Sequence, residues 1–222
     1  MALKKFVELN HPIEDGMAVY PGFPSPKIGA FLTREESRPH YNGKAEFYIG
    51  KIEMVGNVGT YLDAPFHRYS TGMDLSRIPL EMVAGVAGLV VDGIVSSDRS
   101  IAIDFVESEL HGRAVLVRTG WEKKWGTPSY WELGPYLSDD SVELLLNSKV
   151  ALVGVDFWNI DNTENHARPA HTRLLAANIP IVEHLCNLSN LPNAGFRFYA
   201  VPLRIVGGAS FPVRAFAELD ET

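Results

Sequence analysis

The sequence predicts a single α/β domain with more strand than helix. Several short segments are almost entirely apolar, whereas only three segments have apolar residues at helical spacing. Glycine and proline, with 19 and 14 copies in 222 residues, punctuate the chain between these segments. No repeat, low-complexity segment or charge block divides it, so residues 1–222 are expected to form one domain with a sizeable core.

The first strand is expected in residues 45–55. Phe47 and Ile49 are two positions apart and would face one side of the strand, whereas Ile52 would face the other side. Gly50 stands at the phase change and predicts a β-bulge there. Apolar runs that end in polar residues predict further buried strands. These are 83–91, 114–118, 150–155 and 197–206, the last interrupted by Pro202.

Helices are expected in three places. Ser138 is a typical N-cap for a helix over 138–146, whose apolar residues then recur every three or four positions. Residues 103–110 and 169–177 are the other candidates, and the latter opens with a proline that suits a first helical turn. Before all of these, residues 10–44 are rich in proline and predict an ordered arm or loop, near a site or at a subunit contact.

Charge and composition exclude several classes of partner. The formal net charge is −7 and no basic run occurs, so nucleic acids and anionic membranes are not expected to bind. The longest apolar stretch is far too short to span a bilayer. The single cysteine, Cys186, allows neither an intrachain disulfide nor a cysteine-based zinc site and is expected in the core. A small-molecule partner and a cytoplasmic location are the remaining expectations.

Reactive side chains concentrate in residues 57–67, which read Asn-Val-Gly-Thr-Tyr-Leu-Asp-Ala-Pro-Phe-His. Gly59 permits a close backbone approach, Asp63 stands before a rigid proline turn, and His67 supplies an imidazole four residues later. Spacing alone leaves two interpretations of each polar residue. Asp63 suits an Asx-turn as well as a ligand site, and His67 suits a surface position as well as a catalytic one.

This segment resembles the signature of the cyclase family, which includes bacterial kynurenine formamidases and isatin hydrolases. The family pattern is His-x-Gly-Thr-His-x-Asp-x-Pro-x-His, and the chain keeps Gly59, Thr60, Asp63, Pro65 and His67. Similar blocks follow one another along nearly the whole chain, at 9–13, 20–22, 118–121, 154–156, 160–161, 171–175, 181–183 and 187–192. The resemblance implies a swivelling β/β/α, barrel-like mixed sheet with flanking helices, assembled as a homodimer or tetramer.

Two positions depart from the family pattern. The two other motif histidines, which with the aspartate bind a divalent metal in the family, are Asn57 and Tyr61 here. An asparagine carbonyl is a weak neutral ligand, and a tyrosine must lose a proton of pKa about 10 to coordinate. Zinc affinity should therefore be low, because catalytic zinc usually has three protein ligands. The alternative is that both side chains only fill the metal cavity with a hydrogen bond.

A second constellation is retained. The resemblance joins Asp63 to His171 and Glu183, which correspond to the other metal site of two-metal family members. These groups would suit one Zn²⁺, Mn²⁺ or Mg²⁺ ion, weakly bound or absent, with Asn57 at most a minor ligand. A buried hydrogen-bonded pair of His171 and Glu183 without metal is the competing interpretation.

The resemblance implies an arylformamidase-like hydrolase that cleaves the C–N bond of a small amide or cyclic amide. The expected catalytic groups are Asp63, Tyr61, His67, His171 and Glu183; His67 would carry the proton and Tyr61 would donate to an oxyanion. The second hypothesis is a metal-independent cyclase, lyase or isomerase that uses these side chains as an acid–base cluster. The third is a non-catalytic binding protein on the same fold, which the retention of four titratable groups disfavours.

Other polar and aromatic residues give weaker indications. His11 and His40 are candidates for lining a pocket from the proline-rich region. Arg118 is expected to form a structural ion pair with Asp156 or Asp161. The four tryptophans are expected mostly in the core or at an interface, and the resemblance adds an aromatic pocket for a flat, aromatic or cyclic substrate.

Overall fold

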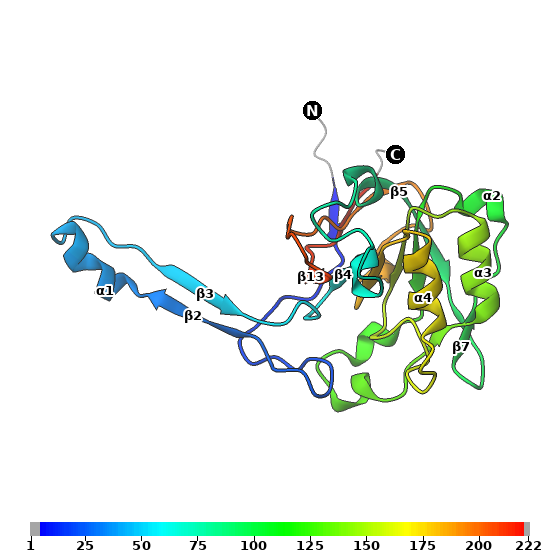
Figure 1. Cartoon of the computed structure of the whole chain (residues 1–222), viewed down its shortest axis with the longest axis horizontal. Coiled ribbons are helices and arrows are strands. Elements are labelled where there is room, and N and C mark those ends of the chain that lie inside the picture. Colours follow the sequence, from blue (N-terminus) through cyan, green and yellow to red (C-terminus); the bar gives the residue numbers. More distant parts are fainter. Residues whose placement is uncertain (1–4, 220–222) are drawn as a thin grey trace.

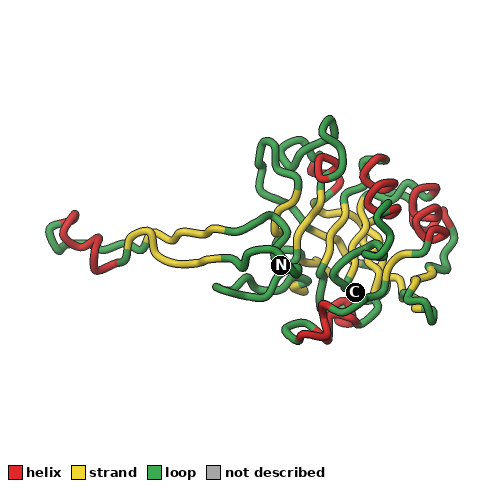
Figure 2. The backbone as a smooth tube through the Cα atoms, turned by 60° about the horizontal axis from the view of Figure 1, so that its bottom comes forward, coloured by secondary structure: helices red, strands yellow, loops and turns green. Residues whose placement is uncertain are grey.

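A nine-stranded mixed sheet runs through residues 5–219, the part of the chain that the computed structural model describes. Its strands in spatial order are β1 (Phe6–Glu8), β14 (Phe216–Leu219), β12 (Phe196–Tyr199), β5 (Ala84–Asp92), β8 (Ala114–Arg118), β10 (Leu152–Val155), β11 (Ile181–Glu183), β4 (Tyr61–Asp63) and β13 (Ser210–Pro212). The central strands β5, β8, β10 and β11 are parallel, and antiparallel pairs flank them. This architecture confirms the predicted α/β class, with few helices beside a large mixed sheet (Figures 1 and 2).

The central strands are apolar up to their last residues because both of their faces are buried. In β8, Val115 and Val117 belong to one hydrophobic cluster, while Ala114 and Leu116 belong to a second cluster on the other face. Helices α3 (Asp139–Asn147) and α4 (Pro169–Ala176) lie side by side and cover the first of these clusters (Figure 1). Strand prediction was accurate here because an all-apolar run needs two covered faces.

Both longer helices begin where the sequence predicts. The Ser138 hydroxyl caps α3 by accepting from the backbone N–H of Ser141, and Pro169 opens α4. The helix expected over 103–110 is largely wrong, because only α2 (Glu107–Leu110) forms. The residues directly before position 103 form the strand β7 (Ser100–Ala102).

Smaller elements complete the body. A three-stranded sheet contains β7 with β6 (Ile94–Val95) and β9 (Tyr136–Leu137). Short 3₁₀ helices are η1 (Arg38–Tyr41), η2 (Pro65–His67), η3 (Leu80–Met82), η4 (Trp121–Lys124), η5 (Pro128–Trp131) and η6 (Leu188–Asn190). The strand predicted over 197–206 ends early, because β12 stops at Tyr199 before Pro202. No helix within residues 5–219 has the length and hydrophobicity that a bilayer crossing requires.

A long hairpin projects from the body (Figures 1 and 2). It is formed by β2 (Lys27–Leu32), α1 (Arg34–Ser37), η1 and β3 (Ile49–Glu53). A register irregularity does occur opposite the predicted bulge, but it lies on β2 between Ala30 and Leu32 rather than at Gly50. Large apolar side chains on this hairpin are exposed, among them Phe31 at 73% and Ile52 at 61%.

Candidate active site

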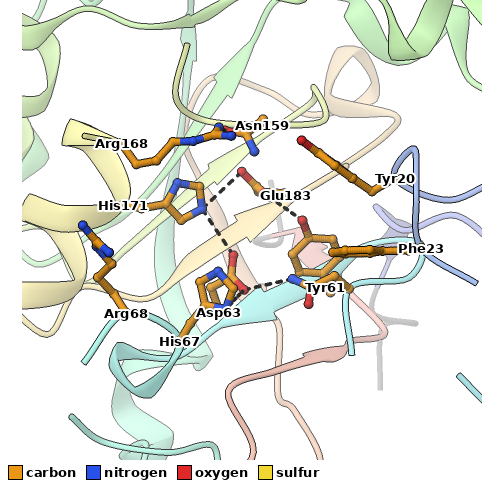
Figure 3. A pocket seen from close by; sticks show the side chains of 11 residues that line it. Tyr20, Phe23, Tyr61, Asp63, His67, Arg68, Asn159, Arg168, His171 and Glu183 are labelled. Carbon is orange, nitrogen blue, oxygen red and sulfur yellow. Dashed lines mark hydrogen bonds and ion pairs between the residues drawn. The ribbon is translucent and has the colours of Figure 1, made fainter. Parts of the chain in front are cut away.

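A pocket beside β4 and β11 collects side chains from distant parts of the chain (Figure 3). Its volume is about 360 Å³. The residues that line it are Tyr20, Phe23, Asn57, Tyr61, Asp63, His67, Arg68, Asn159, Arg168, His171 and Glu183. The structure therefore brings together the catalytic and metal candidates that the sequence singled out: Asn57, Tyr61, Asp63, His67, His171 and Glu183.

The register of β4 sets the floor of the pocket. Tyr61 and Asp63 are two residues apart in one strand, so their side chains point to the same face. Pairing with β11 sets Glu183 opposite Tyr61, and pairing with β13 sets Ser210 opposite Asp63. Two carboxylates and two hydroxyls are thus buried in one small area.

His171 enters this area from the first turn of α4, and Asp161 holds it there. The Asp161 carboxylate accepts from the backbone N–H of Ala170 and of His171, and it lies 2.6 Å from His171 Nδ1. This contact fixes the ring so that Nε2 faces the floor, 3.6 Å from Asp63 Oδ2 and 3.7 Å from Glu183 Oε1. Orientation of an imidazole by a carboxylate on the opposite nitrogen is typical of metal-binding histidines.

The surrounding carboxylates dominate the protonation of this imidazole. Burial lowers the pKa of His171, but the hydrogen bond with Asp161 and the nearby carboxylates of Asp63 and Glu183 outweigh burial and raise the pKa to about 10. Burial raises the pKa of Asp63, and the nearby imidazoles of His171 and His67 reverse this to a net lowering. Without a metal ion, His171 is therefore an imidazolium beside an ionised Asp63.

His67 stands at the open side of the pocket, with its side chain 37% exposed. Its Nδ1 lies 3.1 Å from Ser210 Oγ, whose hydroxyl donates to Asp63 Oδ1. Because that single hydroxyl hydrogen is directed at Asp63, Ser210 accepts from His67 Nδ1–H. In the neutral ring the lone pair is then on Nε2, as a general base requires.

Neutral donors occupy the two positions that lack the family histidines. The Tyr61 hydroxyl donates to Glu183 Oε2 over 2.5 Å, and Asn57 Nδ2 donates to Asp63 Oδ1 over 3.4 Å. Burial, together with the charges of Glu183 and Asp63, raises the pKa of Tyr61 well above 10, so the phenol keeps its proton. Burial is also the main reason that the pKa of Glu183 is raised to about 7.

The donor set fits a divalent cation. Asp63, His67 and His171 each offer a ligand atom, and these atoms lie within 4.8 Å of one another. Asp63 Oδ2 is buried and has no hydrogen-bond partner among the described residues, which a cation would remedy. One carboxylate and two imidazoles match the usual count for a catalytic site. The sequence predicts Glu183 as the third ligand. Its carboxylate oxygens accept hydrogen bonds from the Tyr61 hydroxyl and from the backbone N–H of Ile160.

Several expectations about individual residues were wrong. Arg118 pairs with Asp92, 2.7 Å away, rather than with Asp156 or Asp161. Asp156 accepts instead from the backbone of Thr119 and Gly120, and Asp161 serves His171.

The two candidate histidines of the proline-rich region also lie elsewhere. His11 stacks on Trp125 with ring centroids 3.8 Å apart, and His40 belongs to η1 of the projecting hairpin. Neither lines the pocket. Cys186 is buried, as the sequence predicts.

Sequence reasoning missed the roles of Ser210 and Asp161. Nothing near Ser210 in the sequence signals its position, since it reaches Asp63 only through the β4–β13 register. Asp161 carried a usable signal, because an acidic residue shortly before a proline-opened helix suits its N-terminus. Tyr20 and Phe23 come from the proline-rich region that the sequence suggests near a site, whereas no sequence signal marked Arg68 and Arg168 as lining residues.

Comparison with known proteins agrees with this geometry. The Cyclase family model ("Putative cyclase") matches residues 7–162. The chain is 26% identical over 217 residues to a kynurenine formamidase of Bacillus cereus, covering 97% of this chain and 98% of the relative. It is 28% identical over 214 residues to a kynurenine formamidase of Salinibacter ruber, covering 94% and 95%.

Solved structures share the fold. Isatin hydrolase A from Labrenzia aggregata, bound to benzyl benzoate, superposes with a TM-score of 0.78 at 22% identity, over 98% of this chain and 94% of that chain. A structure described as a potential metal-dependent hydrolase with cyclase activity gives a TM-score of 0.76 at 23% identity, over 99% and 100%. At these identities the likeness is one of fold.

Proposed function

Since this chain belongs to the cyclase family, we propose that it is a hydrolase that cleaves the C–N bond of a small amide or cyclic amide, in the manner of an arylformamidase. The observation that carries the proposal is the convergence of Asp63, His67, His171 and Glu183 on one pocket from segments far apart in the chain. Kynurenine formamidases and isatin hydrolases among its relatives and structural neighbours support the same reaction class.

His67 is the general base and acid of the proposed reaction. Its Nε2 takes a proton from the attacking water, whose oxygen bonds to the amide carbonyl carbon. The same nitrogen then returns the proton to the departing nitrogen as the C–N bond breaks, which leaves a carboxylic acid and an amine. The Ser210–Asp63 contact holds the imidazole in the tautomer that this transfer needs.

Asp63 and His171 would hold a divalent cation, with Glu183 as the third ligand. A cation at this point supplies Lewis-acid polarisation of the carbonyl and a water of lowered pKa. This ligand set leaves His67 free for proton transfer, whereas the set of Asp63, His67 and His171 would occupy it. Asp161 keeps His171 Nε2 directed at the site in either case.

Tyr61 acts through Glu183 in this proposal. The sequence suggested that its hydroxyl donates to an oxyanion, but the hydroxyl already donates its hydrogen bond to Glu183 Oε2. Donation to a substrate would first have to break a buried bond to a carboxylate. Tyr61 is therefore proposed as a positioning residue that fixes the Glu183 carboxylate.

A metal-independent cyclase, lyase or isomerase is the second candidate. It is favoured by one observation: the two positions that lack family imidazoles hold neutral donors bonded to the carboxylates. A Glu183 whose pKa is about 7 and an imidazolium at position 171 would then form the acid–base pair.

The substrate is proposed to be flat, aromatic or cyclic, because Tyr20 and Phe23 form one wall of the pocket. A homo-oligomer, dimer or tetramer, is also proposed. The exposed apolar side chains of the projecting hairpin, such as Phe31 and Ile52, support it because such side chains are typically covered by a partner.

Hydrolysis can be tested directly. The purified protein is incubated with an aryl formamide and with a fused cyclic aryl amide, and release of the amine is followed by absorbance. Each assay is run with EDTA and again after adding Zn²⁺ or Mn²⁺. We expect hydrolysis that EDTA abolishes and added metal restores. Absence of hydrolysis under every condition would refute the proposed reaction, and turnover unaffected by EDTA would favour the metal-independent alternative.

A further inference from the structure

Two arginines that the proposed mechanism does not use line the same pocket. Arg68 and Arg168 flank His171 in Figure 3. Both are anchored on the first turn of α4: Arg168 is its N-cap, and Arg68 Nε donates to Thr172 Oγ1 over 3.1 Å. Both arginine side chains line the pocket beside His171, which belongs to the same turn of α4. The two guanidinium groups are thus brought to one side of the pocket.

Neither guanidinium has an anionic partner within residues 5–219. Arg68 is bonded to the neutral hydroxyl of Thr172, and Arg168 donates to Asn159 Oδ1 over 3.2 Å. The nearby carboxylates of Asp161 and Glu183 are engaged by other groups. Six other arginines in the described chain do pair with carboxylates: Arg38, Arg77, Arg99, Arg118, Arg173 and Arg214. Arg197 and Arg204, which lie outside the pocket, bond to backbone carbonyls.

The backbone at Arg168 is unusual as well. Its φ of 49° and ψ of 62° lie in the left-handed region, which favours glycine or asparagine over a long side chain. The conformation turns the chain into α4 while Arg168 remains part of the pocket lining. An arginine kept in a strained conformation beside reactive groups is typical of a functional position.

The opposite side of the pocket is aromatic. Tyr20 and Phe23 face the arginines across the cavity in Figure 3, with ring centroids 5.2 Å apart and planes tilted by 39°. Tyr20 is supported from behind by Trp158, at 5.5 Å between centroids. A ligand between the two walls would contact flat apolar surface on one side and two cations on the other.

We propose that Arg68 and Arg168 bind a carboxylate group of a substrate whose flat ring packs against Tyr20 and Phe23. The guanidinium fork matches the two oxygens of a planar carboxylate, and such charge-assisted bonds are the stronger kind. The substrates are accordingly anionic aryl or cyclic amides. This assignment of substrate class rests on the proposed hydrolase function, but anion binding itself requires no turnover.

Benzoate and benzamide provide a matched pair of probes, because they differ in charge and hardly in shape. Their binding to the full chain is measured by calorimetry in EDTA, so that no metal holds the carboxylate. We expect benzoate to bind at least tenfold more tightly than benzamide. Arg68→Gln and Arg168→Gln should each weaken benzoate binding about tenfold and leave benzamide binding within twofold. Arg168→Lys should recover part of the affinity, and Arg77→Gln, which alters an arginine paired with Asp74, should change nothing.

Equal binding of the two probes, or benzoate affinity that is unchanged in both glutamine variants, would overturn the inference. Loss of benzamide and benzoate binding together would also overturn it, since that pattern indicates a damaged pocket rather than a lost cation. The outcome is separable from the hydrolase proposal. Charge-dependent binding without amide hydrolysis would leave the inference standing alone, and hydrolysis without it would refute the inference only.

Discussion

Around His171 the buried carboxylates are balanced by imidazoles, whereas around Tyr61 they are balanced by neutral hydrogen-bond donors. In the first region Asp63 Oδ2 has no hydrogen-bond partner among the described residues, and His171 Nε2 faces it. In the second, Glu183 accepts from the Tyr61 hydroxyl and from a backbone N–H. An unsatisfied buried atom such as Asp63 Oδ2 can engage a cation or a substrate directly, whereas the hydrogen bonds to Glu183 hold its carboxylate in a fixed orientation.

The largest effect is expected from replacing His67, the proposed general base, which lies near His171. His67→Gln keeps a polar side chain but cannot shuttle a proton, so hydrolysis of an aryl formamide should fall about a thousandfold. The melting temperature should hardly change, because this side chain is partly exposed. Steady-state kinetics of parent and variant measure the effect. A kcat within a factor of three of the parent would exclude His67 as the base.

Next comes the carboxylate behind His171. Asp161→Asn removes the charge that orients the ring, and metal affinity should fall about tenfold to a hundredfold. Calorimetric titration with Mn²⁺ measures the difference. Asp92→Asn is the matched control, because Asp92 pairs with Arg118 away from the pocket. If both variants bind Mn²⁺ with the same affinity, the contact of Asp161 with His171 does not contribute to metal binding.

Histidines introduced at the two positions that hold neutral donors would make the region around Tyr61 resemble the region around His171. Asn57→His with Tyr61→His adds two neutral imidazoles beside Asp63, which rebuilds the three-ligand set of the family pattern. Zinc affinity should rise at least tenfold, about 1.4 kcal/mol. Metal titration of the parent and the double variant measures it. Equal affinities would mean that the two departures have no bearing on metal binding.

The smallest effect is expected where an imidazole is packed against an aromatic ring instead of carboxylates. Burial against Trp125 lowers the pKa of His11 from 6.5 to about 4, in contrast to His171. Between these two values the unfolded chain binds a proton that the folded chain does not, so stability falls as pH drops from 6.5 to 4. After allowance for partial exposure, the loss should be about 1–2 kcal/mol.

Urea unfolding at pH 7 and pH 4.5 measures this loss. His11→Gln is the control, because its amide does not titrate in this range. The pH dependence of the variant should be shallower than that of the parent by the same amount. Parallel curves would show that acid sensitivity arises elsewhere.

Local sequence pattern predicted the secondary structure correctly where one physical requirement dominated. Residues 114–118 form a strand because an all-apolar run can only be buried on two faces, and a serine cap with apolar spacing fixed the start of α3. Prediction failed over most of 103–110, where only the short helix α2 forms at the end of the segment. It failed for Arg118 because several aspartates were available and only folding selects one.

The sequence by itself determined which chemical groups the site contains: one motif aspartate and histidine, a later histidine and glutamate, and neutral Asn57 and Tyr61. Those identities limit the donors, acceptors and charges, and they need no coordinates to be recognised. Tertiary structure decided which atoms meet. The pairing of β4 with β11 and β13 placed Glu183 beside Tyr61 and Ser210 beside Asp63. Hydrogen-bond direction and burial follow from such long-range register, which local sequence does not encode.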